Sequence, residues 1–177
     1  MAHNSQKAFC LSVKRRFPDK FKNCGVLDVG SLDINGNNRF LFEGNYTYIG
    51  LDIGPGNNVD VICKAHEYQP GKQFDVVIST ECFEHDPFWK LSLQKCVELT
   101  KPGGVFLFTC AYYCRAEHGT ACTNTVEAAP HVVAIFGDYY KNLGEKEIEE
   151  ALDLKNLFSS YECSHLEGDL RFWGIRK

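Results

Sequence analysis

Short apolar runs alternate with amphipathic segments over most of this chain. Five runs rich in Val, Ile, Leu and Phe are each short enough to be buried strands, and they lie at residues 25–29, 47–53, 59–63, 74–78 and 105–109. Two more strands are predicted near the end of the sequence, at 159–166 and 170–176, with the tight-turn signal Gly168-Asp169 between them. The pattern therefore predicts seven strands, of which the last two form a hairpin.

Segments with helical spacing of apolar residues separate these strands. Residues 3–17 form an amphipathic pattern that ends before Pro18, and residues 87–100 place most of their apolar side chains on one face. Shorter helices are predicted at 35–42 and 145–154. Strands that alternate with helices and then end in a hairpin predict an α/β sheet with helices on both faces.

The loop after the first strand and the end of the second strand carry the clearest chemical signal. Val26-Leu-Asp-Val-Gly30 leads into a small and polar loop, and Tyr48-Ile-Gly-Leu-Asp52 ends in an acid. Gly30 lets the backbone turn sharply and lets a ligand approach closely. Asp52 can accept hydrogen bonds from both hydroxyls of a ribose, and ligands of such sheets bind at the carboxyl ends of the strands. The sequence therefore predicts a site for an adenosine-containing cofactor.

Composition narrows the class of protein. The 177 residues, 44% apolar and 24% charged, are most simply one soluble globular domain. The net charge of −4 argues against a nucleic-acid surface, and the sequence has neither an apolar run of membrane-spanning length nor a signal-peptide pattern. Nine cysteines without a Cys-x-x-Cys pair suit reduced thiols in the cytoplasm. We expect no metal site, because the spacing of Cys110, Cys114, His118 and Cys122 is not a standard zinc spacing.

Four segments in order give the chain a family resemblance. They are Val26-Leu-Asp-Val-Gly30, Tyr48-Ile-Gly-Leu-Asp52, the stretch 74–85 and the stretch 99–108. With these segments the chain resembles a class I S-adenosylmethionine-dependent methyltransferase of the small "methyltransferase type 11" kind. The resemblance covers about 24–110, and it implies a Rossmann-like seven-stranded sheet, mostly parallel, whose last strand is antiparallel.

The resemblance also implies roles for individual residues. Asp28 would lie near the methionine ammonium, Gly30, Ser31 and Leu32 would face the methionine and sugar, and Asp52 would bind the ribose hydroxyls. The adenine would meet Ile53, Ala65 and His66, and the methionine end would meet Thr80 and Glu81. The chain has Lys64-Ala-His66 where the family often has an acid, and Gly30-Ser-Leu-Asp-Ile-Asn-Gly36 replaces the commoner tight Gly-x-Gly.

Each of these residues also has a purely structural interpretation. Gly30 could serve only a turn, Asp52 could cap a turn, and Asp28 could be a buried acid satisfied by backbone amides. Glu84-His85 is expected to cap the helix that follows and to brace its loop.

Residues 111–143 are irregular, and a segment of this length inside a compact domain is usually a lid or a binding loop. We expect it to bind the methyl acceptor, with Arg115, Tyr113, Asp138 and Tyr139 as candidate acceptor-binding residues. His118 is the candidate general base, because the unperturbed pKa of histidine is about 6.5, close to neutral pH. The alternative is that His118 and Asp138 only fix the loop.

The sequence thus predicts a single domain, 1–177, in which the N-terminal helix (3–17), the cofactor-binding half (24–110), the acceptor loop (111–143) and a C-terminal helix and hairpin (145–177) follow in order. The expected activity is methyl transfer to a small-molecule acceptor, by a monomer or a homodimer. An Asn/Asp-Pro-Pro-Tyr/Phe motif is missing after the fourth strand, which argues against methylation of DNA bases or glutamine. A nicotinamide oxidoreductase lacks support because Gly30 and Gly36 do not fit Gly-x-Gly-x-x-Gly. A cofactor-binding domain without catalysis, acting as an interaction or sensor protein, stays open.

Overall fold

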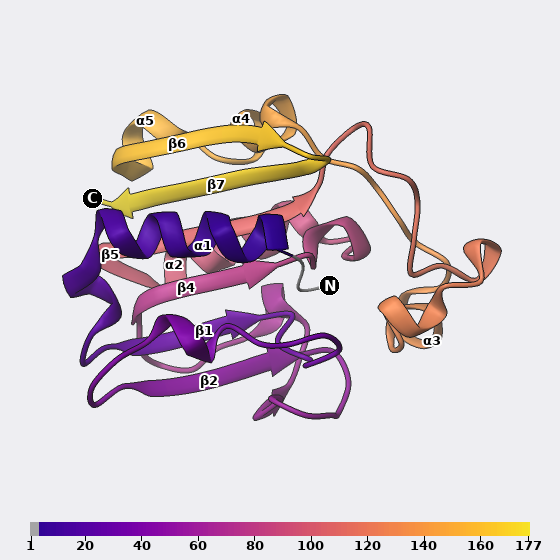
Figure 1. The fold of residues 1–177 in the computed structure, drawn as a ribbon, viewed down its shortest axis with the longest axis horizontal. Helices are drawn as coiled ribbons and strands as arrows, with labels where there is room; N and C mark the ends of the chain where they lie inside the picture. Colours follow the sequence, from indigo (N-terminus) through magenta and orange to yellow (C-terminus); the bar gives the residue numbers. More distant parts are fainter. Residues whose placement is uncertain (1–3) are drawn as a thin grey trace.

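The computed structural model describes residues 4–177, which form a seven-stranded sheet in the order β3-β2-β1-β4-β5-β7-β6 (Figure 1). The strands are β1 Gly25–Val29, β2 Thr47–Asp52, β3 Val61–Ile62, β4 Phe74–Thr80, β5 Thr100–Ala111, β6 Phe158–Leu166 and β7 Asp169–Arg176. β7 runs antiparallel to both β5 and β6, and the remaining pairs are parallel. The predicted Rossmann-like sheet with an antiparallel last strand is confirmed.

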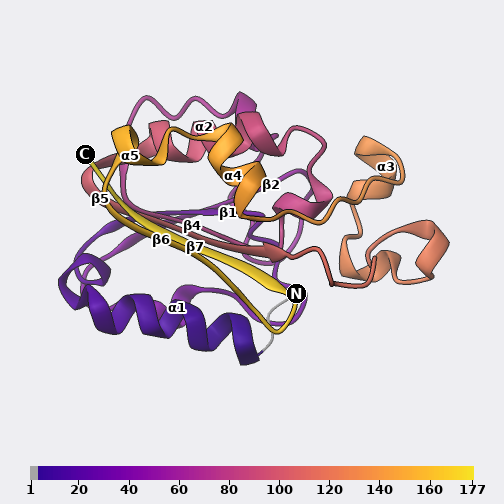
Figure 2. The same ribbon diagram turned by 90° about the horizontal axis from the view of Figure 1, so that it is seen from above.

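Helices cover both faces of the sheet (Figure 2). α1 (Asn4–Arg16) lies on one face, where Phe9 and Val13 pack in a cluster with the inward side chains of β1, β4 and β5. α2 (Trp89–Leu99), α4 (Glu145–Ala151) and α5 (Leu154–Leu157) lie on the other face over a second cluster. The predicted helix at 3–17 corresponds to α1, and its first residue, 3, lies outside the described residues. Within 4–177, no helix is both long and apolar enough to cross a membrane.

Several predicted boundaries are wrong for local reasons. The helix predicted at 35–42 is only a 3-10 turn, η2 (Arg39–Leu41), because Asn37 bonds to Asp33 and accepts from the Arg39 N–H instead of continuing a helix. The helix predicted at 145–154 ends at Ala151, and a separate turn of helix, α5, begins where the Asp153 side chain accepts from the Asn156 N–H.

Strand boundaries differ as well. The strand predicted at 59–63 shrinks to β3, while β5 starts earlier than predicted, at Thr100. The hairpin between β6 and β7 turns at Glu167 and Gly168, which both have positive φ, rather than at Gly168-Asp169.

The chain reverses its direction of travel across the sheet between β1 and β4. β1, β2 and β3 are added in one direction, and β4 and β5 then follow on the other side of β1. In open α/β sheets a crevice forms outside the carboxyl ends of the strands at such a reversal. Residues 112–144, which contain the short helix α3 (Val132–Phe136), extend beyond this same edge of the sheet (Figure 1).

Candidate functional site

A cavity lies at the carboxyl ends of β1, β2 and β4, and it encloses about 960 Å³ of empty space when its open mouth is included. All of the predicted cofactor residues except His66 line it: Asp28, Gly30, Ser31, Leu32, Asp52, Ile53, Ala65, Thr80 and Glu81. The structure therefore brings these sequence-predicted residues together around one space.

Asp52 organises the loops at one end of the cavity. Its Oδ2 accepts from the Leu32 N–H at 3.0 Å, and its Oδ1 accepts from the Ile53 N–H at 2.8 Å and the Gly54 N–H at 3.4 Å. Burial raises the pKa of this carboxyl, while the three backbone donors oppose the rise. Asp52 thus holds the loop that begins at Gly30 (the glycine loop) against the end of β2, and it presents a carboxylate to the cavity.

Asp28 is the second carboxylate on the cavity wall, and it is buried. It accepts from the Tyr48 hydroxyl and, at 3.2 Å, from the Asn38 amide. Burial raises its pKa to about 6, against the opposing effect of these two hydrogen bonds. The same Asn38 amide nitrogen lies 3.1 Å from Thr80 Oγ1, so Asn38 ties the ends of β1 and β4 together.

Asn38 was missed by sequence reasoning. The signal was the polar run Asn35-Gly-Asn-Asn38, which was interpreted as part of a helix.

The glycine loop is held close to the neighbouring strands. Gly30 has a φ of +76°, and a Cβ there would lie 2.5 Å from Cys82 Sγ. The Gly30 and Ser31 N–H groups both donate to the Leu51 carbonyl, and Ser31 Oγ donates to the Asn58 carbonyl at 3.0 Å. The loop therefore presents backbone and Leu32 to the cavity, while the Ser31 hydroxyl is turned toward the 54–60 loop.

The segment 128–136 forms the opposite wall, which sequence reasoning placed only in the acceptor loop. Ala128, Ala129, Pro130, His131, Val132 and Phe136 all line the cavity. His131 Nε2 lies 2.9 Å from the Pro55 carbonyl oxygen, and a Cβ on Gly54 would come within 2.2 Å of the His131 ring. This segment thus covers the end of β2, where Asp52 and Ile53 lie. The apolar run Val132-Val-Ala-Ile-Phe136 was the available signal.

His66 lies behind the cavity wall. Its ring packs 4.4 Å from the ring of Phe88, and Phe88 in turn contacts Phe136, with ring centroids 6.0 Å apart. The Lys64 ammonium lies over both phenylalanine rings. His66 therefore supports an aromatic cluster next to Ala65 and does not itself face the cavity.

Arg115 joins the strands instead of facing the cavity. It bonds to Asp169 Oδ1 and lies 3.6 Å from Glu81 Oε2, and both acids have fully buried side chains. Glu81 also accepts from the Thr109 hydroxyl at 2.7 Å. The guanidinium balances the charge of two buried carboxylates, and this structural role accounts for the position of Arg115 without an acceptor.

The other acceptor candidates lie outside the cavity lining. The Tyr113 hydroxyl donates to Glu147, and its ring packs over Gly144 at the start of α4. Asp138 accepts from the Ala121 N–H at 2.7 Å. This contact fixes the loop, which is the role that the alternative interpretation gave to Asp138. Tyr139 is half-buried and does not line the cavity either. The geometry does not bring these side chains together with the cofactor residues.

His118 lies one step behind the cavity wall, next to His85, which lines it. The two rings meet edge-on with centroids 5.1 Å apart, and Tyr140 packs against both. His118 Nδ1 lies 3.1 Å from the Ala116 carbonyl oxygen, so that nitrogen carries the proton and Nε2 keeps its lone pair. Burial lowers the pKa of His118, and it lowers the pKa of His85 to about 3.

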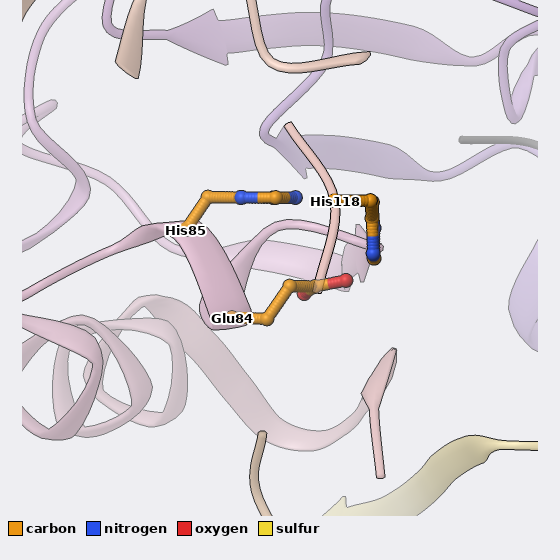
Figure 3. A group of neighbouring side chains, drawn as sticks. All are labelled: Glu84, His85 and His118. Atoms are coloured by element: carbon orange, nitrogen blue, oxygen red, sulfur yellow. The ribbon is translucent and has the colours of Figure 1, made fainter. Parts of the chain in front are cut away.

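Glu84 lies beside these histidines and is completely buried (Figure 3). Burial and the nearby charge of Glu81 raise its pKa to about 8. The expectation that Glu84-His85 caps the following helix is wrong. The N-cap residue of α2 is Phe88, without a side-chain cap, and Asp86 braces the first turn by accepting from the Phe88 N–H and the Ser92 hydroxyl.

The cysteines are all free, and Cys110 is buried in the sheet while Cys122 bonds to Glu117. Among residues 4–177, the metal-ligating side chains that gather closely are Glu84, His85 and His118.

The comparisons with known proteins agree with this architecture. Residues 1–134 match the family model described as "Methyltransferase domain". The chain belongs to this methyltransferase family. No curated protein sequence matches the chain.

Solved structures share the fold at low sequence identity. The 1,6-didemethyltoxoflavin-N1-methyltransferase of Burkholderia thailandensis, solved with 1,6-didemethyltoxoflavin and S-adenosylhomocysteine, is 14% identical with a TM-score of 0.65, over 97% of this chain and 77% of that one. The PH0226 protein from Pyrococcus horikoshii OT3 is 14% identical with a TM-score of 0.63, over 96% and 89%.

A third solved structure is longer than this chain. The phosphoethanolamine N-methyltransferase 2 of Haemonchus contortus, in complex with S-adenosyl-L-methionine, is 21% identical with a TM-score of 0.56, over 89% of this chain and 38% of that one. Together the three share the methyltransferase fold.

Proposed function

We propose that this chain transfers a methyl group from S-adenosylmethionine to a small-molecule acceptor. The observation that carries the proposal is the pair of carboxylates, Asp28 and Asp52, on the wall of one cavity where the direction of the sheet reverses. Membership of the methyltransferase family supports it, and so do the related structures that hold S-adenosylmethionine or S-adenosylhomocysteine.

The residues present suit that cofactor. The Asp52 carboxylate can accept charge-assisted hydrogen bonds from the ribose hydroxyls. Ile53, Ala65 and Phe136 provide an apolar surface for the adenine. Asp28 offers negative charge to the methionine ammonium at the buried end of the cavity.

The acceptor would enter from the side of residues 112–144. When bound, S-adenosylmethionine supplies a methyl group on a sulfonium, which passes to a lone pair of the acceptor as the carbon–sulfur bond breaks. Residues of the stretches 80–86 and 128–136 line the cavity and would shield bound cofactor and acceptor from water. His118, with a free Nε2 lone pair, is the residue proposed to accept a proton from the acceptor.

Calorimetric titration tests the proposal. S-adenosylmethionine and S-adenosylhomocysteine should bind with dissociation constants of about micromolar order, and NAD should not bind. A purified, folded chain that binds neither adenosyl compound would overturn the proposal. Binding without turnover over a wide screen of small acceptors would instead favour a cofactor-binding domain without catalysis.

A further inference from the structure

The side chains of Glu84, His85 and His118 converge behind the cavity wall (Figure 3). Glu84 and His85 belong to the 3-10 turn η4 (Phe83–His85) after β4, and His118 comes from the segment after β5. One potential ligand atom from each residue lies within 4.8 Å of the other two. We infer that these three side chains bind a divalent transition-metal cation.

Glu84 supplies the strongest reason. Its side chain is completely buried, and neither carboxylate oxygen has a hydrogen-bond partner among the described residues. A buried carboxylate without donors is unfavourable unless a cation or a proton neutralises it. The backbone of this turn is firmly held, since the Glu84 carbonyl accepts from the Lys141 N–H at 2.9 Å, so the side chain has little freedom to reach solvent.

The two imidazoles are prepared for metal binding. His118 Nδ1 is directed to the Ala116 carbonyl oxygen, and this contact leaves the Nε2 lone pair available, as is usual for histidine ligands of metals. His85 Nδ1 is buried and has no hydrogen-bond partner among residues 4–177. The lack of a side chain at Gly119 makes room for the His85 ring, because a Cβ there would lie 2.7 Å from His85 Cε1.

Charge and geometry at the site also suit a divalent cation. The guanidinium of Arg115 is engaged with the carboxylates of Glu81 and Asp169. Tetrahedral ligands at about 2.0–2.1 Å from zinc lie about 3.4 Å apart, so small side-chain rotations close the cluster around an ion. Two imidazoles and one carboxylate favour zinc, iron, cobalt or manganese over magnesium, and they leave at least one coordination position open.

The open coordination position could bind the methyl acceptor, and this part of the inference rests on the proposed function. His85 and Glu81 both line the cavity, so the cluster adjoins the end at which the methyl group is expected. An acceptor hydroxyl placed there would lose its proton to solvent more readily, since a divalent cation lowers the pKa of an oxygen that it binds. The oxygen would then form its bond to the methyl carbon as the carbon–sulfur bond breaks. The inference therefore names acceptors that carry a hydroxyl, and it assigns His118 Nε2 to the cation instead of to proton transfer.

Metal titration tests the inference directly. Chelator-treated protein is titrated with Zn²⁺ by calorimetry and with Co²⁺ by visible absorption, and Mg²⁺ serves as the comparison cation. We expect one saturable Zn²⁺ site per chain, weakened at least about tenfold in Glu84→Gln and in His118→Asn. His165→Asn is the matched control, because His165 is exposed on β6 and paired with Glu145, and it should bind Zn²⁺ as the unchanged chain does.

Titration with S-adenosylhomocysteine in the presence of chelator separates this inference from the proposed function and checks folding of each variant. Intact cofactor binding without saturable Zn²⁺ binding overturns the metal site alone. Equal Zn²⁺ affinity in the unchanged chain, Glu84→Gln and His118→Asn also overturns it. If Glu84→Gln fails to bind S-adenosylhomocysteine, the half-buried His118→Asn decides, since it removes one ligand without emptying the core.

Discussion

The Cα of Gly30 lies so close to Cys82 that an added Cβ would come 2.5 Å from its sulfur and 2.6 Å from its Cβ. The loop after β1 thus lies directly against Cys82, two residues beyond the end of β4, at the point where the sheet reverses direction. Gly30 and Cys82 both line the cavity, so a side chain added at Gly30 would displace part of the cavity wall.

Gly30→Ala should therefore abolish measurable cofactor binding. Its φ of +76° already costs a non-glycine residue about 1 kcal/mol, and the contact with Cys82 adds steric overlap. Gly71→Ala is the control, because Gly71 has a φ of +66° with nothing within 4 Å of an added Cβ. Calorimetry with S-adenosylhomocysteine on both variants measures the difference, and equal affinities would show that the close approach is unimportant.

Asp52→Ala should weaken S-adenosylmethionine binding tenfold or more. The variant loses the proposed ribose contacts, which are worth at most about 1.5–3 kcal/mol each, and it leaves the Leu32 and Ile53 N–H groups without their acceptor. Asp52→Asn keeps one acceptor oxygen and should have an intermediate affinity. An unchanged dissociation constant in Asp52→Ala would remove this residue from the site.

Asp28 should make the unliganded protein less stable as the pH rises from about 4 to about 7. Its folded pKa of about 6 lies above the ordinary value of 3.8, so between these values the folded state binds more protons than the unfolded state. The stabilising contribution is present below the unfolded pKa and is lost as the pH rises through the folded pKa. The corresponding free energy is at most about 3 kcal/mol.

Asp28→Asn isolates this effect, because it cannot ionise. Chemical denaturation of both proteins at several pH values should show the stability difference moving in favour of the variant between about pH 4 and about pH 7. A difference that stays constant over this range would contradict the raised pKa.

Gly54→Ala should weaken cofactor binding by pushing the segment 128–136 away from β2. The added Cβ would lie 2.2 Å from the His131 ring. We expect roughly a tenfold loss of affinity, because the wall over Asp52 opens to water. In a His131→Ala background the overlap is relieved, and adding Gly54→Ala should then cost little. Strictly additive losses in this double-mutant cycle would argue against the contact as the cause.

Arg115→Ala should destabilise the fold by about 3–5 kcal/mol, as expected when one partner of a buried ion pair is removed. It takes the guanidinium away from the buried carboxylates of Glu81 and Asp169. Lys146→Ala is the control, because that side chain is 81% exposed and its ion pair with Glu150 is 4.0 Å long. Thermal and denaturant unfolding measure both, and unchanged stability would instead leave Arg115 available for an anionic acceptor.

The sheet and the cofactor wall were predictable because a few local rules determine them. Apolar runs indicated the five parallel strands, and the carboxyl ends of β1, β2 and β4 meet at one edge, so Gly30 and Asp52 were found from their positions. Asp28 and Thr80 followed from the family resemblance. Short polar connections were harder, since the Asn37 side chain bonds within its own loop, a choice that periodicity does not encode.

The region after β5 could not be predicted from its residue types. Tyr113 and Arg115 are close neighbours in sequence, yet Tyr113 contacts Glu147 on α4 and Arg115 reaches Asp169 on β7. Which partner each side chain finds depends on tertiary packing. The convergence of Glu84 with His118 is equally invisible in the sequence, because the two segments are brought together only through β5 and its loop.

The hydrogen bond from the Leu143 N–H to the Ala111 carbonyl, 2.9 Å long, closes the long connection after β5 at its base. Everything between these two residues is attached to the sheet through a fixed entrance and exit. Because the entropy of closing a loop changes only slowly with its length, changes of length within this connection should cost the sheet little wherever they spare Arg115, which balances the buried carboxylates of Glu81 and Asp169. Under the proposed function, exchanging the parts of residues 112–142 that touch neither the sheet nor the cavity is the natural route to a changed acceptor specificity.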